Sequence, residues 1–406
     1  MKYGLLGKKL SHSFSKELHS RFGTYDYEMF EIEEKDLDDF FSRDDLAAIN
    51  VTIPYKEKVI KYCDEVSPVA KRIGAINTIT FSDKIRGYNT DYLGLKYVIE
   101  SNKIDINNKD VFILGDGGTS KTARVLLEDL NAKSITNVTR GKSEVNYENI
   151  YKYSPQIIVN TTPVGMYPNN GESLIDLEKI PSLEAIIDVV YNPLMTKLIF
   201  DGKNLGLKTG QGLPMLIEQG RRASEIFTGL KISEEKKLKV ENKIRRYNSN
   251  LILVGMPGVG KSEFAYELGK RMNREYIDID NIIKKKYGEP KKIITEKGED
   301  FFRDIESKVV REVGKLNHKV IATGGGLLVK EENYYHLKQN GRIYLLKRDL
   351  DKLSTRGRPL SKGKGSLLTL YEKRKDLYER FSDKDIYNMG RIDLSVLNIL
   401  EDFYEN

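Results

Sequence analysis

The chain has 406 residues, enough for two or three domains, and 39% of them are hydrophobic, enough for real cores. Its 67 basic and 60 acidic residues leave a formal charge of +7, and no basic block is interleaved with aromatics as in a nucleic-acid groove. No apolar run approaches the roughly 18 residues of a membrane span. A single cysteine, Cys63, excludes an internal disulfide and any multi-cysteine metal site. We therefore expect a cytoplasmic protein that handles anionic small molecules, without nucleic-acid or membrane partners; the oligomeric state stays open.

The first 90 or so residues predict an α/β lobe of their own. Strand candidates stand at 3–6, 48–53 and 78–81, with helices between them. Short polar segments stand at the ends of apolar runs, where α/β proteins place their ligands. They are 11–15, 50–56, 74–78 and 87–91. Together they predict a pocket for a polyhydroxylated molecule.

The next part of the chain predicts a dinucleotide site. A strand at 111–114 leads into Gly115-Asp116-Gly117-Gly118, and a helix is expected over 123–130. The glycines allow a tight turn and close approach of the backbone to a pyrophosphate, although an ordinary turn could carry the same pattern. The following strand, 134–139, ends at Arg140 with Lys142 just beyond. Basic residues there suit a 2′-phosphate, so NADP is favoured over NAD unless they only solvate a loop.

Two further runs, 157–159 and 185–190, do not alternate and are apolar apart from Asp188. Such strands are typical of a parallel sheet that is covered by helices on both faces. We therefore predict a Rossmann-like lobe after the first α/β lobe.

Residues 1 to about 230 resemble shikimate dehydrogenase. The motifs that carry the resemblance are the serine-rich opening at 7–19, Asn50-Val51-Thr52-Ile53-Pro54-Tyr55-Lys56, Gly74-Ala75-Ile76-Asn77-Thr78, Asn89-Thr90-Asp91 with Gly94, and the segments 160–166, 188–193 and 212–219. The resemblance implies Lys56 and Asp91 as the catalytic pair. It implies that the substrate is bound by Ser13, Ser15, Thr52, Asn77, Asp91, Tyr191 and Gln219, and NADP by Gly115, Gly117, Gly118, Thr139, Arg140 and Lys142.

The chemistry gives a reason for the lysine. Hydride delivered to a ketone carbon leaves an alkoxide, which a positioned Lys56 ammonium can stabilise and protonate. Asp91 would orient that lysine and keep it charged. The alternative is a purely structural salt bridge.

A charged stretch at 231–248 is expected to be a linker that is partly helical, on which Leu238 and Ile244 could still pack. The expected domains are a substrate lobe at 1–93 completed by a helix at about 215–230, an NADP lobe at 94–214, this linker, and a final domain at 249–406.

The final domain opens with a phosphate-binding loop. Gly255-Met256-Pro257-Gly258-Val259-Gly260-Lys261-Ser262 stands between a strand-like run at 251–254 and a helix-like run at 263–271. Amides of such a loop and the following helix N-terminus hold a triphosphate. A strand at 275–277 then runs into Asp278 and Asp280, two carboxylates that could serve metal and substrate.

Residues from about 249 to 406 resemble shikimate kinase, through the loop above, Arg303 in 298–306, Gly324-Gly325-Gly326, Arg358-Pro359-Leu360 and Arg374 in 371–378. The fold implied is a P-loop domain with a parallel sheet covered by helices. ATP would be bound by Gly258, Gly260, Lys261, Ser262 and Arg358, and Mg²⁺ by Ser262 and Asp278. Lys261, Asp280 and Arg358 would be catalytic. Shikimate would be bound by Asp280, Arg303, Gly324, Gly325, Gly326 and Arg374.

Both resemblances concern one molecule. They imply a bifunctional enzyme that reduces 3-dehydroshikimate to shikimate with NADPH and then phosphorylates shikimate with MgATP. Two alternatives stay open, a quinate-preferring dehydrogenase that uses NAD and a non-catalytic sensor of shikimate. The presence of Lys56, Asp91, Lys261 and Asp280 argues against the sensor.

Overall fold

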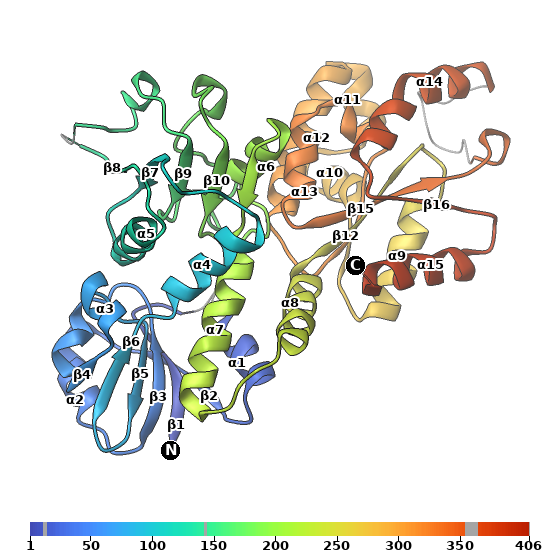
Figure 1. Cartoon of the computed structure of the whole chain (residues 1–406). Coiled ribbons are helices and arrows are strands. Elements are labelled where there is room, and N and C mark those ends of the chain that lie inside the picture. Colours follow the sequence, from blue (N-terminus) through green and yellow to red (C-terminus); the bar gives the residue numbers. More distant parts are fainter. Residues whose placement is uncertain (11–13, 142–143, 354–363, 406) are drawn as a thin grey trace. The chain divides into compact units, whose positions relative to one another are not determined.

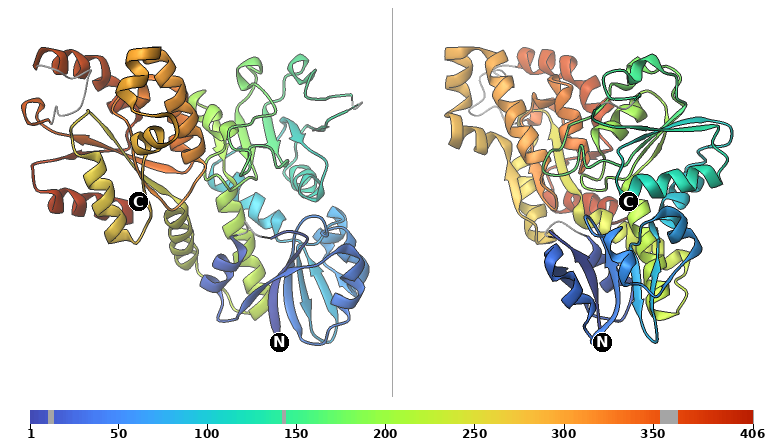
Figure 2. Two further views of the ribbon diagram at one scale, coloured as in Figure 1. Left: turned by 180° about the vertical axis from the view of Figure 1, so that it is seen from behind. Right: turned by 90° about the vertical axis from the view of Figure 1, so that its left-hand side faces the viewer.

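The computed structural model describes residues 1–10, 14–141, 144–353 and 364–405. Contacts divide the chain into two compact units, the first of residues 1–192 and 196–244, the second of 193–195 and 245–406. Figures 1 and 2 show both as layers of helices over sheets. The α/β class that the sequence predicts is confirmed, whereas the lobe boundaries stay a prediction. Within the described ranges, no helix is long and apolar enough to cross a membrane.

The first unit begins with a mixed six-stranded sheet in the order β2-β1-β3-β5-β6-β4. Strands β2 and β3 flank β1 in parallel, and β5 pairs antiparallel with both β3 and β6. The strands are β1 (Lys2–Gly7), β2 (Tyr27–Glu31), β3 (Leu46–Val51), β4 (Glu65–Val66), β5 (Thr78–Phe81) and β6 (Ile85–Tyr88). The helices are α1 (Ser15–Phe22), α2 (Leu37–Phe41) and α3 (Pro68–Ile73), with 3₁₀ turns at Glu34–Asp36 and Lys58–Tyr62.

The strand expected at 48–53 is displaced by two residues. Three successive β-branched residues, Val51, Thr52 and Ile53, suggest continued strand, but β3 ends at Val51. The chain turns at Thr52, whose carbonyl accepts from the Tyr55 amide at 2.9 Å, and Ile53 is 70% exposed. This turn brings Lys56 back toward the end of the sheet.

The second sheet of this unit is five-stranded and parallel throughout, in the order β11-β10-β9-β7-β8. Buried apolar side chains from β7, β9 and β10 form its core with α4, α5 and α7. The strands are β7 (Asp110–Leu114), β8 (Ser134–Val138), β9 (Ile157–Asn160), β10 (Ala185–Asp188) and β11 (Lys208–Gly210). The helices are α4 (Asp91–Ser101), α5 (Gly118–Asp129), α6 (Lys197–Asn204) and α7 (Gly212–Thr228), with 3₁₀ turns at Ile150–Lys152 and Leu177–Lys179.

Two expected bounds in this part of the chain are wrong, one of a strand and one of a helix. The run 185–190 is strand only to Asp188, because the Asp188 carboxylate accepts from the Val190 amide at 3.1 Å and turns the chain. Helix α5 begins at Gly118, five residues before the expected start, because the amide of Lys121 already bonds to the Gly117 carbonyl. The glycine turn therefore leads straight into a helix N-terminus.

The charged segment after α7 forms one helix, α8 (Glu234–Asn248). Lys237, Val240 and Ile244 are buried along it, whereas Leu238 is 46% exposed. Only Ser249 separates α8 from the first strand of the second unit, β12.

The second unit holds a five-stranded parallel sheet in the order β13-β14-β12-β15-β16. Its core joins the sheet to helices on both sides. The strands are β12 (Asn250–Gly255), β13 (Tyr276–Asp278), β14 (Val320–Ala322), β15 (Gly341–Lys347) and β16 (Lys384–Tyr387). The helices are α9 (Lys261–Met272), α10 (Ile279–Tyr287), α11 (Pro290–Lys297), α12 (Glu299–Gly314), α13 (Glu332–Lys338), α14 (Lys364–Phe381) and α15 (Ile392–Glu405), with 3₁₀ turns at Leu327–Val329 and Leu350–Lys352.

Candidate active sites

Lys56 and Asp91 form an ion pair in the first unit. The Lys56 ammonium lies 2.6 Å from Asp91 Oδ2, and the two side chains are only 15% and 11% exposed. Lys56 follows the turn after β3, where its carbonyl accepts from the Ile76 amide at 2.7 Å. Asp91 is the first residue of α4. A charge-assisted contact so little exposed to water is screened weakly, so the carboxylate fixes the position of the lysine side chain.

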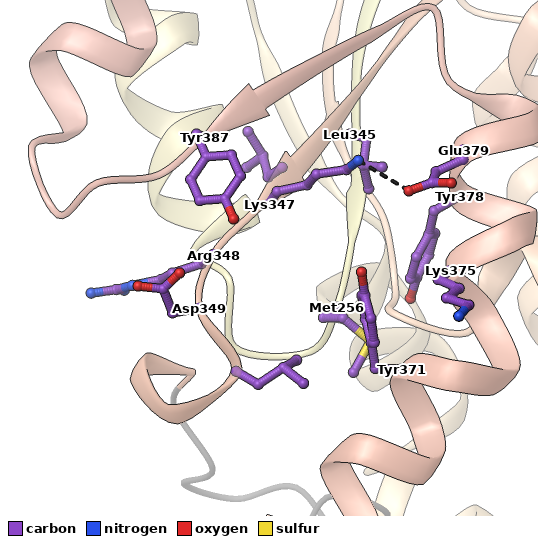
Figure 3. A pocket seen from close by; sticks show the side chains of 12 residues that line it. Met256, Leu345, Lys347, Arg348, Asp349, Tyr371, Lys375, Tyr378, Glu379 and Tyr387 are labelled. Atoms are coloured by element: carbon purple, nitrogen blue, oxygen red, sulfur yellow. Dashed lines mark hydrogen bonds and ion pairs between the residues drawn. The ribbon is translucent and has the colours of Figure 1, made fainter.

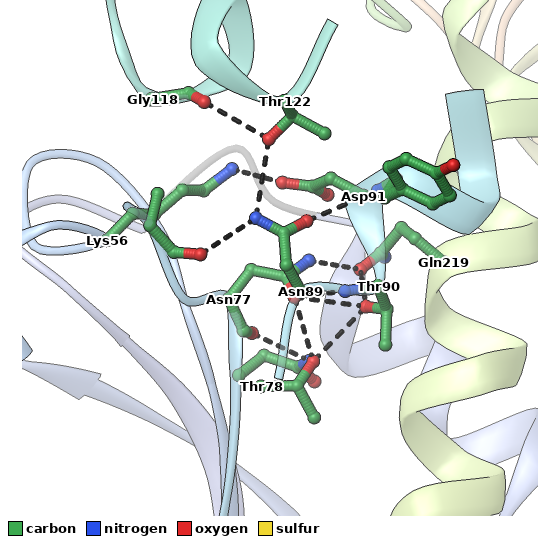
Figure 4. A network of polar contacts seen from close by, with 12 residues as sticks. Lys56, Asn77, Thr78, Asn89, Thr90, Asp91, Gly118, Thr122 and Gln219 are labelled. Atoms are coloured by element: carbon green, nitrogen blue, oxygen red, sulfur yellow. Dashed lines mark hydrogen bonds and ion pairs between the residues drawn. The ribbon is translucent and has the colours of Figure 1, made fainter. Parts of the chain in front are cut away.

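A buried amide network adjoins this pair (Figure 4). Asn77 Nδ2 donates to Gln219 Oε1 at 3.4 Å, which joins the end of the first sheet to α7. Asn77 Oδ1 accepts from the Thr90 amide at 2.7 Å and from the Thr78 hydroxyl at 3.0 Å. Both amide side chains are at most 9% exposed. Lys56, Asp91, Asn77 and Gln219, predicted from four separate motifs, are thus brought together.

The remaining predicted substrate residues of this unit are partly placed. Ser15 begins α1 and is buried, and the amide of Thr52 bonds to the Leu6 carbonyl at 2.9 Å, just past the end of β3. The Tyr191 ring packs against Phe14, with ring centres 5.2 Å apart. Ser13 lies outside the described residues.

The glycine turn after β7 leaves room beside the N-terminus of α5. Gly115 has a φ of +105°, a conformation that other residues rarely adopt. A Cβ added at Gly117 would meet no described atom within 4 Å, and one at Gly118 would lie 3.7 Å from the Lys56 side chain. Free space at a helix N-terminus, next to the lysine, suits a pyrophosphate.

Thr139 and Arg140 lie just past the end of β8, which stops at Val138. Thr139 makes a single bridge to Asn146, and Arg140 is exposed. Burial raises the pKa of Tyr147, Arg140 opposes that shift, and Asp116 adds to it. Arg140 and Asp116 therefore both act electrostatically on this tyrosine. Lys142 lies outside the described residues.

In the second unit, the loop from Gly255 to Lys261 has the form of a phosphate cradle. Gly255, Gly258 and Gly260 have φ values of +137°, +90° and +105°. Lys261 opens α9 and is 8% exposed, and its ammonium donates to the carbonyls of Gly255 at 2.8 Å and Met256 at 3.1 Å. The loop thus folds back around its own lysine at a helix N-terminus, where an anion is favoured.

Ser262 and Asp278 meet beside this cradle. The Ser262 hydroxyl donates to Asp278 Oδ2 at 2.5 Å, while Asp278 Oδ1 caps α10 by accepting from the Asn281 amide at 3.1 Å. No group of three or more His, Cys, Asp or Glu residues suited to a metal occurs in the described part of the chain. Two oxygen atoms beside a phosphate site still fit Mg²⁺, which usually keeps waters and phosphate oxygens as its other ligands.

The predicted acceptor residues gather around the glycine turn after β14. A Cβ at Gly324 would lie 3.0 Å from Asp280 Oδ1, and one at Gly326 would clash with the Arg303 guanidinium. The Gly325 carbonyl accepts from Arg374 Nη1 at 2.9 Å and from the Tyr378 hydroxyl. Asp280, Arg303 and Arg374 therefore share one site. Arg358 lies outside the described residues.

Glu306 is a member of this site to which the sequence motifs assigned no role. Its Oε2 accepts from Arg303 Nη1 at 2.6 Å, and its side chain is 1% exposed. Burial raises the pKa of the Glu306 carboxyl and Asp280 adds to the shift, while Arg303 opposes it. Arg303 and Glu306 stand three residues apart in α12, about one helical turn, and this spacing could have suggested the pair.

A pocket of about 190 Å³ adjoins the phosphate loop (Figure 3). Met256 of the loop lines it, together with residues at the end of β15 and along α14. The lining includes Arg348, Tyr371 and Tyr387. Aromatic and basic side chains thus stand next to the phosphate cradle.

Comparisons with known proteins separate the two halves of the chain. Residues 5–79 match the family model "Shikimate dehydrogenase substrate binding domain", and residues 257–403 match "Shikimate kinase". The chain is 38% identical over 254 residues to the shikimate dehydrogenase (NADP(+)) of Clostridium perfringens strain SM101, a match over 57% of this chain and 94% of the relative.

Solved structures give the same result for the first unit. Shikimate dehydrogenase 1 from Peptoclostridium difficile is similar with a TM-score of 0.56 and 37% identity, over 60% of this chain and 98% of that one. A chorismate mutase/shikimate 5-dehydrogenase fusion protein from Clostridium acetobutylicum is similar with a TM-score of 0.57 and 33% identity, over 60% of this chain and 96% of that one. The shikimate 5-dehydrogenase of Thermus thermophilus, solved with NADP(H) and shikimate, is similar with a TM-score of 0.54 and 26% identity, over 60% of this chain and 99% of that one.

Proposed function

The chain belongs to the shikimate dehydrogenase family and also carries a shikimate kinase domain, and from this premise we propose which of its residues perform each reaction. It is a bifunctional enzyme of the shikimate pathway that uses NADP and ATP. We infer that its first unit reduces 3-dehydroshikimate to shikimate and that its second unit phosphorylates shikimate to shikimate 3-phosphate. A cytoplasmic location, suggested by the single cysteine, stays a prediction.

In the dehydrogenase, Lys56 is the proton donor to the substrate. When bound, the reduced nicotinamide supplies the hydride for the ketone carbon. The Lys56 ammonium holds a proton where negative charge grows on the ketone oxygen, and delivers it there. Asp91 orients that ammonium through the 2.6 Å contact. The Lys56 to Asp91 pair is the observation that carries the proposal.

Substrate hydroxyls would be bound by the polar groups around this pair. Asn77 and Gln219 already bond to each other across the junction of the sheet and α7. Thr90 and Thr78 fix the Asn77 carbonyl oxygen, and the Asn77 amide nitrogen, which gives one N–H to Gln219, can donate its other N–H toward a ligand. Ser13, Ser15, Thr52 and Tyr191 complete the proposed set.

The turn of Gly115, Gly117 and Gly118 would hold the pyrophosphate of NADP. The open space at Gly117 and the N-terminus of α5 fit that group. Thr139, Arg140 and Lys142 would bind the 2′-phosphate, which distinguishes NADP from NAD.

In the kinase, the chain's own residues orient the acceptor. When bound, MgATP supplies the phosphoryl group and the cation that offsets its charge. Asp280 accepts the proton of the attacking shikimate hydroxyl. Arg303 and Arg374 bind the shikimate carboxylate, because a guanidinium fork matches a carboxylate. The amides of Gly324 to Gly326 would contact its hydroxyls.

The phosphate side of the kinase uses the cradle. Lys261 would exchange its bonds to two carbonyls of its own loop for phosphate oxygens. Gly258 and Gly260 give the loop its open backbone, and Ser262 and Asp278 would hold Mg²⁺. Arg358 is proposed to neutralise charge that develops during transfer.

One experiment tests the whole assignment. The purified chain, given 3-dehydroshikimate, NADPH and MgATP, is expected to form shikimate 3-phosphate, with NADPH consumed first. Lys56→Ala should abolish reduction and leave phosphorylation of added shikimate, while Lys261→Ala should do the reverse. If either substitution removes both activities from a folded chain, the two sites are not independent and the assignment is wrong.

A further inference from the structure

Asn89 is a buried junction between three elements of the dehydrogenase. Its amide nitrogen donates to the Ala75 carbonyl at 3.0 Å and to the Thr122 hydroxyl at 3.3 Å (Figure 4). Its carbonyl oxygen accepts from the Tyr92 amide at 3.2 Å, at the start of α4. Asn89 is 7% exposed and Thr122 only 1%. The side chain therefore ties the turn before β5, the start of α4 and the start of α5 to one another.

The Thr122 hydroxyl continues this connection to the glycine turn. Its Oγ1 donates to the Gly118 carbonyl at 3.1 Å. Gly118 lies against Lys56 and Ala75, since an added Cβ would be 3.7 Å and 3.8 Å from their side chains. One hydroxyl thus stands between the turn proposed to hold the cofactor pyrophosphate and the helix that begins with Asp91.

We propose that Thr122 is a positioning residue of the dehydrogenase, which acts through Asn89 to fix the Gly117-Gly118 turn relative to the Lys56 and Asp91 pair. The inference rests on the proposed function and deepens it. Hydride transfer depends steeply on the placement of donor and acceptor, and displacements of about 1 Å cost on the order of a hundredfold in rate. A buried bond between the elements that carry the two sides of the reaction is suited to limit such displacement.

A local explanation covers only part of the geometry. Threonine hydroxyls inside helices often bond to the carbonyl four residues earlier, which accounts for the bond to Gly118. It does not account for the Asn89 amide that donates to the same hydroxyl from another element. Both protons of that amide have acceptors, so removal of the hydroxyl leaves a buried N–H unsatisfied.

The test compares Thr122→Val, which keeps the shape and removes the hydroxyl, with Thr122→Ser, which keeps the hydroxyl. With the Val variant, we expect kcat for reduction of 3-dehydroshikimate to fall about tenfold, with both KM values within about twofold of the parent. The deuterium isotope effect measured with NADPH labelled at the transferred hydrogen should increase, because hydride transfer becomes more rate-limiting. The Ser variant should behave like the parent. Kinase kcat in the same chain should stay unchanged in both.

Hydrogen exchange of the ligand-free chain supplies a readout apart from activity. Peptides covering 115–124 should exchange faster in the Val variant and not in the Ser variant, while peptides of α6 stay protected as in the parent. If the α6 peptides lose protection and show that the Val variant does not fold, Thr122→Cys takes its place with the same expectations.

Three outcomes overturn the proposal: parental kcat and isotope effect in the Val variant, equal loss in the Ser variant, or a loss of activity with an unchanged isotope effect. Each requires a parent chain that reduces 3-dehydroshikimate. A parent without that activity refutes the proposed function instead.

Discussion

The ammonium of Lys237 lies 3.4 Å from the centre of the Tyr97 ring and 2.5 Å from Glu234 Oε1. The lysine side chain has no exposed surface, and Tyr97 belongs to α4, the helix that begins with Asp91. Glu234 also pairs with Arg221 of α7 at 3.3 Å. Helix α8 is thus attached by charge and by an aromatic face to the two helices that carry Asp91 and Gln219.

Lys237→Ala should destabilise the dehydrogenase selectively. The change removes a desolvated cation–π contact and the packing of the lysine stem, together worth about 2 kcal/mol. Heating should therefore inactivate reduction at a lower temperature than in the parent, with the kinase inactivation temperature unchanged. Lys239→Ala, on the same helix but with a 70% exposed side chain, is the matched control. If both substitutions lowered the inactivation temperature of reduction equally, the role of Lys237 would be contradicted.

Ser262→Ala should raise the Mg²⁺ requirement of the kinase. The substitution removes one of the two oxygens proposed to face the metal, and even the loss of a group that only supports a metal ligand costs about tenfold or more in metal affinity. Shikimate phosphorylation measured against Mg²⁺ concentration should show half-saturation displaced upward, with Ser262→Thr close to the parent. Glu263→Ala, one residue further, should have no effect. An unchanged Mg²⁺ curve for Ser262→Ala would remove this residue from the metal site.

Arg140→Ala should lower the preference for NADP. A charge-assisted bond from a guanidinium to the 2′-phosphate is worth about 1.5–3 kcal/mol, so kcat/KM for NADPH should fall about tenfold to a hundredfold. The value for NADH should change little. Lys133→Ala, which removes a positive charge just before the first residue of β8, is the control. It should leave the ratio of kcat/KM for NADPH to kcat/KM for NADH unchanged. If kcat/KM fell equally for NADPH and NADH, Arg140 would act on the fold and not on the 2′-phosphate.

Asp188 should make stability depend on pH in an unusual direction. Burial raises the pKa of this carboxyl to about 6, although Asn160, Val190 and Thr196 donate hydrogen bonds to it. Since the folded chain takes up the proton near pH 6 and the unfolded chain near pH 4, this group favours folding below pH 4 and loses that contribution as the pH rises through 6.

Asp188→Asn removes that titration. Between pH 7 and pH 4 the parent should gain up to roughly 3 kcal/mol of stability relative to the variant. Thermal inactivation of the dehydrogenase at a series of pH values measures the difference. Parallel pH profiles for the two chains would mean that Asp188 titrates normally.

Much of the fold could be read from residue order because local pattern and burial agree. The run Val111 to Leu114 is apolar throughout, and it forms the buried part of β7, an interior strand of a parallel sheet between β9 and β8. The phosphate loop could also be predicted, since its glycines adopt the positive φ angles that the motif requires. Lys56 and Asp91 were found through motifs, and their 2.6 Å contact joins segments 35 residues apart.

What the sequence could not provide depends on partners from distant elements. Nothing in the charged run 231–248 shows that Lys237 would be buried while Lys239 stays exposed, because that depends on Tyr97. Ile244 is buried, whereas Leu238, which could equally have packed, is exposed. The bond between Asn89 and Thr122 crosses 33 residues and has no local signature.

The direct passage from α8 to β12 through Ser249 also fixes a stoichiometry. Because α8 continues directly into β12, the central strand of the kinase sheet, one chain carries both units. The dehydrogenase and the kinase are therefore synthesised in equal numbers. Altered expression of this chain scales both capacities together. Their balance then depends on the turnover and affinity of each site, and so on the residues around the proposed catalytic Lys56 and Lys261.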